Sequence, residues 1–428
     1  YDRFSRIFYE IYWFSINSVC YKKLEFQLMI LSTIAAKYRH LIGAIMLIPM
    51  ITFGQLKKPV DLLTGADQSG AYLPLLHGKN VGVVANQTSM KGDLHIVDHL
   101  VESKINIMTV FSPEHGFRGK ASAGEKVNSS IDKKTGLPII SLYGKNKKPT
   151  AEQLKGLDVV IFDIQDVGAR FYTYISTMSY LMEACAENNV TLLILDRPNP
   201  NGYYVDGPVL KKGFESFVGL HPVPIVHGMT VAEYAQMVNG EGWLKNGIKC
   251  KLQIVKCKNY DHKTSYDLPV KPSPNLPNSF AIDLYPSLCL FEGTNVSIGR
   301  GTDFPFQQVG APYFPKGTTT FTPKPNEGAK NPKYEGQLCN GYILQDFAQY
   351  YIHGLGEVYL FWIVEAYKQA PNKDKFFTNF FNTLAGTDEL RKQIESGMSA
   401  MDIRDSWKDD VNKFKNIRQK YLLYPDFQ

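Results

Sequence analysis

Between residues 80 and 196 the chain alternates short, continuous apolar runs with stretches of helical hydrophobic spacing. A continuous apolar run, without alternating polar residues, is typical of a strand that is buried on both faces. Helical spacing predicts helices at residues 93–103 and 176–188. Because strands that alternate with helices indicate βαβ units, we predict an α/β fold with a parallel sheet. The predicted strands are residues 81–85, 106–111, 139–142, 159–163 and 191–196.

The pattern changes after residue 262. A segment rich in proline, residues 268–277, predicts a linker, and a loop-rich stretch follows it at residues 291–325. We therefore predict two domains, a Rossmann-like N-terminal domain at residues 56–262 and a smaller α+β C-terminal domain at residues 272–428. Helical spacing in the second domain predicts helices at residues 344–351, 359–369, 375–382 and 409–421.

The first 54 residues have a different character. The basic residues Lys37 and Arg39 precede an apolar run at residues 41–53, and small residues stand near its end. This order is typical of a secretory signal peptide, and the run is shorter than the ~20 residues that a spanning helix needs. We expect residues 1–54 to comprise a signal peptide and an N-terminal extension outside the domains, with Gln55 as the mature start. The alternative is a buried N-terminal helix.

Export changes the meaning of the charge. The 428 residues carry a formal net charge of +6, but residues 1–54 hold six of the basic and three of the acidic side chains. The remaining chain keeps only +3, without a basic stripe, so we expect no nucleic-acid partner. We also expect no stable membrane span and a periplasmic or extracellular location.

Several familiar catalytic motifs are missing from the sequence. It contains no GxGxxG or P-loop for phosphates, no GxSxG nucleophile elbow and no HExxH zinc motif. The six cysteines show neither a CxxC pair nor a Cys/His cluster with zinc spacing, although Cys250 and Cys257 could pair. We therefore expect no metal and no cofactor.

Polar motifs instead follow the predicted strands directly. The segments 86–88, 112–116, 163–170 and 196–200 each begin where a strand ends. Open α/β sheets bind ligands at the carboxyl ends of their parallel strands. Glu114, in FSPEHGFRG beside His115 and Arg118, is thus a candidate general acid or base; the alternative is a salt-bridged or helix-capping glutamate.

Two further groups of residues offer chemistry. Asp163 and Asp166, near Arg170 and Tyr172, are either an acid/base or metal pair, or Asp166 and Arg170 form a structural ion pair at a helix start. With His227 the two aspartates are the candidate ligands of a metal-dependent ester or phosphate hydrolase. The second domain contributes loops that combine amides, arginine and aromatic rings, a mixture that suits a sugar. These loops hold Asn275, Glu292, Asn295 and Arg300.

These motifs resemble those of one known family. The strings SPEHGFRG, DIQDVGARFYTYISTM, LDRPNPNG, PSPNLP and LFEGTNVSIGRGT are similar to signatures of the NamZ-type exo-β-N-acetylmuramidases, glycoside hydrolase family 171, formerly a conserved domain of unknown function. The resemblance extends in order from about residue 62 to residue 424. It implies a Rossmann-like domain plus a C-terminal domain, with the site in the cleft between them.

The resemblance also implies a function: release of N-acetylmuramic acid from the non-reducing ends of peptidoglycan fragments. Its catalytic glutamate corresponds to Glu114; for a second catalytic residue we choose Glu292, then Asp163. The acetamido group of the substrate is an alternative internal nucleophile. A non-catalytic peptidoglycan-binding protein is the alternative function. The residues expected to bind the muramyl saccharide are Asn86, His115, Arg118, Gln165, Asp166, Arg170, Tyr172, His227, Asn275, Asn295 and Arg300.

Overall fold

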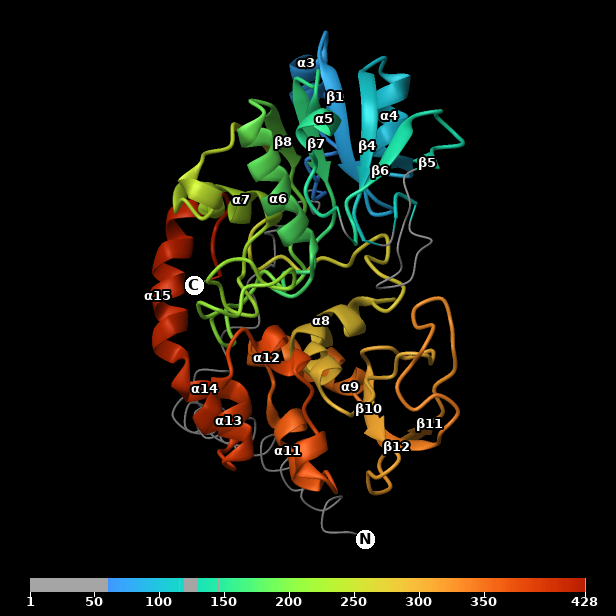
Figure 1. Cartoon of the computed structure of the whole chain (residues 1–428), viewed down its shortest axis with the longest axis vertical. Coiled ribbons are helices and arrows are strands. Elements are labelled where there is room, and N and C mark those ends of the chain that lie inside the picture. Colours follow the sequence, from blue (N-terminus) through green and yellow to red (C-terminus); the bar gives the residue numbers. More distant parts are fainter. Residues whose placement is uncertain (1–60, 115, 119–129, 145, 428) are drawn as a thin grey trace, which may run out of the picture. The chain divides into compact units, whose positions relative to one another are not determined.

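The computed structural model describes residues 61–114, 116–118, 130–144 and 146–427, and these belong to one compact unit that starts at Asp61 (Figure 1). The predicted signal peptide and His115 lie outside the described residues. In the described part of the chain, no helix is long and apolar enough to cross a membrane. The proposed boundary between residues 262 and 272 stays a prediction.

A seven-stranded sheet dominates the N-terminal part, as the sequence predicted. Its strands lie in the order β5-β6-β4-β1-β7-β8-β9, and all neighbours pair in parallel except β5 with β6. Counted along the chain, the six parallel strands have the order 3-2-1-4-5-6 of a Rossmann fold. The strands are β1 (Asn80–Ala85), β4 (Asn106–Ser112), β5 (Ser130–Ile131), β6 (Pro138–Ser141), β7 (Val159–Asp163), β8 (Thr191–Leu195) and β9 (Leu252–Val255).

Burial explains why the strands read as continuous apolar runs. All five residues of β7 are buried, and five of the six residues of β1 are buried. The helix at residues 231–240 begins with a capping box between Thr230 and Glu233. The helices of this part are α3 (Ser69–Leu76), α4 (Ile96–Glu102), α5 (Ala151–Leu154), α6 (Tyr174–Glu187), α7 (Val231–Gly240) and η2 (Lys245–Gly247); β2 (Met90–Lys91) and β3 (Leu94–His95) form a small hairpin.

The C-terminal part combines a small antiparallel sheet with helices, which confirms the predicted α+β character. Its strands are β10 (Gln308–Ala311), β11 (Thr319–Phe321) and β12 (Cys339–Ile343), in the order β10-β12-β11. The view of Figure 1 draws α8 between the two sheets. The helices are α8 (Ser279–Leu288), η3 (Cys289–Gly293), α9 (Gln345–Phe347), η4 (Ala348–Ile352), α10 (His353–Leu355), α11 (Phe361–Gln369), η5 (Lys373–Lys375), α12 (Phe380–Ala385), α13 (Glu389–Glu395), α14 (Ala400–Ser406), α15 (Lys408–Arg418) and η6 (Gln419–Tyr421).

Two predictions for this part were wrong in detail. The helix expected at residues 375–382 starts only at Phe380, because the preceding residues form a 3-10 turn and an extended segment. The stretch expected to be helical at residues 344–351 is helical, but it consists of α9 and the π-helical η4 and continues into α10 beyond residue 351. Helix α8 was not predicted; it contains Pro286 and follows a proline-rich segment.

The end of the chain returns to the N-terminal part. Figure 1 shows α15 beside α7, and Arg418 at the end of α15 donates two hydrogen bonds to the Gly228 carbonyl. The Tyr424 hydroxyl then donates to Asp196 at 2.6 Å, after the end of β8. Asp206 accepts from Arg404 and from Trp407, which adds a further polar link to the C-terminal helices. Buried charged groups therefore hold the two parts of the fold together.

Candidate active site

Glu114 lies just beyond the carboxyl end of β4 and is partly buried. The Thr173 hydroxyl donates to Oε2 of Glu114 at 3.1 Å, and Thr173 immediately precedes α6. The carboxylate is therefore close to the positive end of that helix. Burial and the charge of Glu114 raise the pKa values of Tyr143 and Tyr174. An acidic side chain that keeps some exposure, surrounded by hydroxyl groups, can exchange a proton with a ligand.

A cluster of aromatic rings connects this region to the second candidate carboxyl. The Tyr172 ring lies 4.9 Å from that of Tyr174 and 5.7 Å from that of Tyr285, which α8 carries. After burial, the nearby charges of both Glu292 and Glu114 help to raise the pKa of Tyr285. Both glutamates therefore lie near the same aromatic cluster.

The segment predicted as a linker is fixed against this cluster. The Pro272 carbonyl accepts from the hydroxyl of Tyr172 at 2.9 Å and from that of Tyr174 at 3.4 Å. Gln87, which follows β1, donates to the carbonyls of Lys271 and Pro272. The segment therefore belongs to the architecture of the site and does not act as a free tether.

Glu292 lies in η3 and forms an ion pair with Arg300. Arg300 also donates to the Gly328 carbonyl at 3.2 Å, and Asn275 donates to the same carbonyl at 2.7 Å. Because Asn275 stands three residues after Pro272, these contacts place the Glu292–Arg300 pair at the end of the tyrosine-bound segment. Both members of the pair keep about a quarter of their side chains exposed, at 24% and 28%. Asn295, in the same loop, accepts from the Tyr313 hydroxyl at 2.7 Å.

Asp163 has a different environment. Arg197 binds both of its carboxylate oxygens, at 2.6 and 2.9 Å, and both side chains are almost fully buried. Burial raises the pKa of Asp163, while the charge of Arg197 opposes that effect. The geometry gives Asp163 a structural partner, Arg197, that the sequence did not identify, and offers a substrate no open face of the carboxylate. The ion pair considered between Asp166 and Arg170 is not what the structure shows, because Arg170 donates to backbone carbonyls and Asp166 accepts from the Gly168 amide.

Four of the predicted binding residues are buried among backbone groups. Arg170 donates to the carbonyls of Pro208, Val223, Leu384 and Ala385, and so joins the two parts of the chain. Gln165 donates to the carbonyls of Asp166 and Pro198. Asp166 accepts from the Gly168 amide, and burial raises its pKa to about 7. Burial lowers the pKa of His227 to about 3.

Of the remaining predicted residues, Asn86 lies near Glu114, and Arg118 is paired with aspartates elsewhere. Asn86 is buried but donates to the Tyr174 hydroxyl at 2.9 Å, next to Glu114. Arg118 binds both oxygens of Asp132 and also reaches Asp98. It is thus anchored to two buried acidic side chains of the N-terminal part, while its own side chain stays about one third exposed.

Sequence reasoning missed several groups at the site. Thr173 and Tyr174 stand within the motif DIQDVGARFYTY, so proximity to Tyr172 could have identified them. Tyr285 belongs to the unpredicted helix α8. Lys333, whose ammonium contacts the loop of Glu292, stands in a segment without any hydrophobic pattern.

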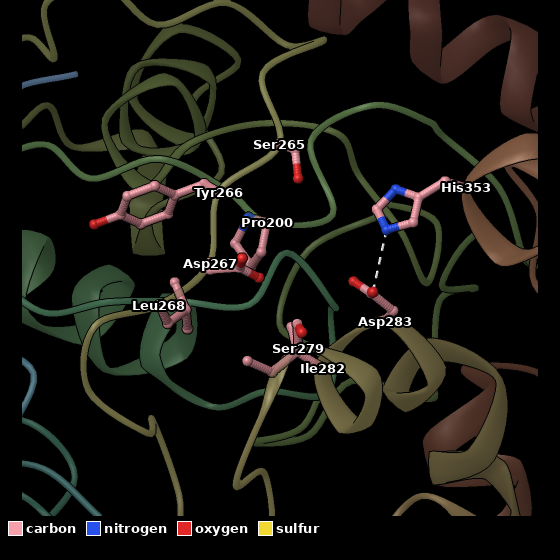
Figure 2. Close-up of a pocket in the computed structure, with 9 residues that line it drawn as sticks. All are labelled: Pro200, Ser265, Tyr266, Asp267, Leu268, Ser279, Ile282, Asp283 and His353. Carbon is pink, nitrogen blue, oxygen red and sulfur yellow. Dashed lines mark hydrogen bonds and ion pairs between the residues drawn. The ribbon is translucent and has the colours of Figure 1, made fainter. Parts of the chain in front are cut away.

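A separate small pocket lies on another face of α8 (Figure 2). Figure 2 shows Asp283 of α8 paired with His353 of α10 at 3.1 Å, with Asp267 on the opposite wall. Tyr203 stacks on the His353 ring. This pocket is lined by Pro200, Ser265, Tyr266, Asp267, Leu268, Ser279, Ile282, Asp283 and His353.

The candidate metal ligands do not converge. Among the described residues, no group of three or more His, Cys, Asp or Glu side chains could hold a metal ion. The five described cysteines are all buried and unpaired, so Cys250 and Cys257 form no disulfide. The arrangement at Glu114 and Glu292 is therefore the best-formed candidate for chemistry in the described part of the chain.

Comparison with known proteins assigns the fold to a family. Residues 81–280 match the N-terminal part of the exo-β-N-acetylmuramidase NamZ family, and residues 283–424 match its C-terminal part. The peptidoglycan β-N-acetylmuramidase NamZ of Bacillus subtilis (strain 168) is 41% identical over 399 residues, which cover 86% of this chain and 92% of that protein.

Two crystal structures agree with this assignment, both of DUF1343 family proteins from Bacteroides fragilis. One is 49% identical, with a TM-score of 0.80, and covers 86% of this chain and 100% of its own. The other is 30% identical, with a TM-score of 0.72, and covers 85% and 99%. Matches that span both parts of the chain show that it belongs to the NamZ exo-β-N-acetylmuramidase family.

Proposed function

We propose that this protein is an exo-acting glycoside hydrolase that releases N-acetylmuramic acid from the non-reducing ends of peptidoglycan fragments. The observation that carries the proposal is the position of Glu114. It is a partly exposed acid at the carboxyl edge of the parallel sheet, held by Thr173 at the start of α6. Membership in the family and the identity to the Bacillus subtilis enzyme support the same activity.

In the proposed mechanism, Glu114 protonates the glycosidic oxygen of the leaving group. Proton donation from a positioned acid contributes 10²- to 10⁴-fold in general acid catalysis. The buried tyrosines beside Glu114 fix the segment at Pro272, and we propose that this fixed segment helps to shape the sugar site. Glu292, whose charge acts on Tyr285 as that of Glu114 does, is the candidate for the second carboxyl.

Arg300 is the proposed partner for the lactyl carboxylate of muramic acid. An arginine matches a carboxylate well because its guanidinium offers parallel donors in one plane. Arg300 keeps part of its side chain exposed, whereas Arg170 is buried and donates its hydrogen bonds to backbone carbonyls inside the fold. Of the two arginines considered from the sequence, the geometry therefore supports Arg300.

Export is part of the proposal. A basic segment followed by the apolar run at residues 41–53 supports a signal peptide, which would deliver the enzyme to the periplasm or the exterior, where peptidoglycan is found. Sequencing the N-terminus of protein recovered from that compartment tests this point, with Gln55 as the expected first residue.

The activity itself is tested by release of a chromophore from a chromogenic N-acetylmuramide. We expect Glu114→Gln to lower kcat by about a thousandfold, because the amide cannot donate the proton. Glu152→Gln is the matched control, since Glu152 is an exposed glutamate in α5. A Glu114→Gln variant with wild-type kcat would remove Glu114 from the acid role. Binding of wall fragments by a wild type without turnover would instead favour the non-catalytic alternative.

A further inference from the structure

The ammonium of Lys333 lies in a cradle of backbone carbonyls around Glu292. Its Nζ donates to the carbonyl oxygens of Thr294 at 2.5 Å, Phe291 at 2.9 Å, and Glu292 and Val296, each at 3.3 Å. These four oxygens belong to one short stretch of chain, the end of η3 and the turn after it. We call this set the carbonyl cradle.

The four converging carbonyl oxygens carry partial negative charges that repel one another, so a positive charge among them is stabilising. The Phe291 carbonyl also accepts from the amide and the hydroxyl of Thr294, and Lys333 is the donor that all four carbonyls share. An ammonium group offers three donors and a full charge, so it neutralises the cradle as a small cation would. Although Lys333 as a residue is exposed, removal of its ammonium from water lowers the pKa of Lys333 to about 8.

The residue before Lys333 lies against Gly301, the neighbour of Arg300 in the chain. Gly301 follows Arg300 and has a φ of +82°, and a Cβ built on it would lie 2.7 Å from Pro332. This close approach requires glycine and fixes the backbone beside Arg300 against Pro332. The dipeptide Pro332–Lys333 therefore touches the backbone next to both members of the Glu292–Arg300 pair.

We propose that Lys333 is a positioning residue of the active site, whose ammonium fills the carbonyl cradle and thereby holds the Glu292–Arg300 pair in its working geometry. Its role in turnover rests on the proposed function. Lys333 contacts backbone oxygens of the protein and not the substrate, so it acts through the position of the pair. The comparisons assign it no role.

The test removes the ammonium and then replaces it from solution. Lys333→Ala leaves the carbonyl cradle empty, and K⁺ or NH₄⁺ is small enough to occupy it, whereas tetramethylammonium is too large and cannot donate. We expect Lys333→Ala to lower kcat/KM for a chromogenic N-acetylmuramide by at least tenfold in tetramethylammonium chloride. Potassium or ammonium chloride at the same ionic strength should restore most of that loss, and should leave the wild type unchanged.

Two outcomes would overturn the proposal. One is wild-type kcat/KM for Lys333→Ala in tetramethylammonium chloride. The other is a loss that neither cation repairs, which would indicate a general defect of folding. Lys324→Ala is the matched control, because Lys324 is an exposed lysine of the same C-terminal region and its backbone also lies next to Gly301. It should show neither a loss nor a response to cations.

A second readout separates this proposal from the proposed function. The Tm of Lys333→Ala should rise in potassium or ammonium chloride relative to tetramethylammonium chloride, and the Tm of the wild type should not. If the wild type released no muramic acid, the proposed function would fail, yet this difference in Tm would still decide whether the carbonyl cradle takes a cation. An unchanged Tm together with unrestored activity would reject Lys333.

Discussion

Two acidic regions lie at the carboxyl edge of the same sheet, and their environments differ. Asp163 ends β7, at the point between β1 and β7 where the strand order reverses and a Rossmann fold holds its dinucleotide. Here Arg197 occupies the carboxylate, and Ser89 donates to the Asp163 carbonyl. Glu114 follows β4, which pairs with the other side of β1. Its side chain stays partly exposed and faces hydroxyl groups.

The difference shows that the protein's own side chains fill the usual ligand position beside Asp163, whereas Glu114 stays partly accessible to a ligand. Thr88 donates to Asn86 and accepts from the Gln165 amide, so the strand ends at the reversal point are joined by their own side chains. A buried charge must be paired, and once it is paired it has little capacity left for a ligand. Exposure and partner chemistry, more than position at the sheet edge, mark the candidate site.

The largest test of this comparison is Asp163→Asn. The substitution leaves the Arg197 charge buried without a counter-charge, which costs about 3–5 kcal/mol in comparable cases. We expect a fall of that size in the free energy of unfolding, measured by urea denaturation. The double variant Asp163→Asn with Arg197→Met should recover part of it, because the unpaired charge is gone.

The same variant, Asp163→Asn, can also contradict the structural role given to Asp163. If Asp163→Asn kept its stability and lost turnover, Asp163 would belong to the catalytic machinery and the reversal point would be the active site. The measurement that decides is kcat for the folded fraction of the variant, set beside its free energy of unfolding.

A smaller effect, on substrate binding, is expected for Arg300, which stays partly exposed. Arg300→Gln removes the charge proposed to meet the lactyl carboxylate, and we expect KM for the muramide to rise about tenfold, a loss of about 1.4 kcal/mol. An N-acetylglucosaminide, which lacks the lactyl group, should show no such change. Arg391→Gln, in an exposed pair with Glu395, is the control. Equal losses on both substrates would contradict the assignment of Arg300.

The smallest effect concerns the pair Asp283–His353, in which the histidine is about half exposed, whereas both members of the Asp163–Arg197 pair are buried. A hydrogen bond to Asp283 raises the pKa of His353 above its usual 6.5, and burial raises the pKa of Asp283. The raised histidine pKa adds stability that is present below pH 6.5 and is lost as the pH rises through the folded-state pKa. Protonation of Asp283 ends the pairing at low pH.

We therefore expect wild type and His353→Gln to differ most in Tm at mildly acidic pH, and to converge at alkaline pH. Thermal unfolding between pH 5 and 9 measures this. A constant difference across that range would show that stacking of Tyr203 on the ring, and not the ion pair, supplies the stability.

Much of the sheet could be predicted from the sequence. Strands β1 and β7 are buried along almost their whole length and β4 is buried from Thr109 onward, so their apolar runs are typical of strands covered on both faces. The edge strands were missed because β9 mixes buried with partly exposed residues and β5 is only two residues long. Helix α8 was missed because proline residues precede it and interrupt it.

The site was predicted less completely, for a physical reason. The motif around Glu114 and the tyrosines of DIQDVGARFYTY were visible as polar or aromatic residues after strands. Spacing alone could not separate Arg170, which binds carbonyls more than 200 residues away, from Arg300, which stays partly exposed. Lys333 carried no signal, because a contact to backbone oxygens leaves no pattern in side-chain type.

By itself the sequence determined the parallel sheet, the polar residues at its carboxyl edge and the resemblance to the NamZ family. These depend on local hydrophobic pattern and on contiguous motifs. Only the tertiary structure decided which charged side chains are buried and paired inside the fold and which stay exposed enough to bind a ligand. That choice depends on partners far apart in the chain, such as Asp163 with Arg197 and Glu292 with Arg300, and on how much water each side chain retains.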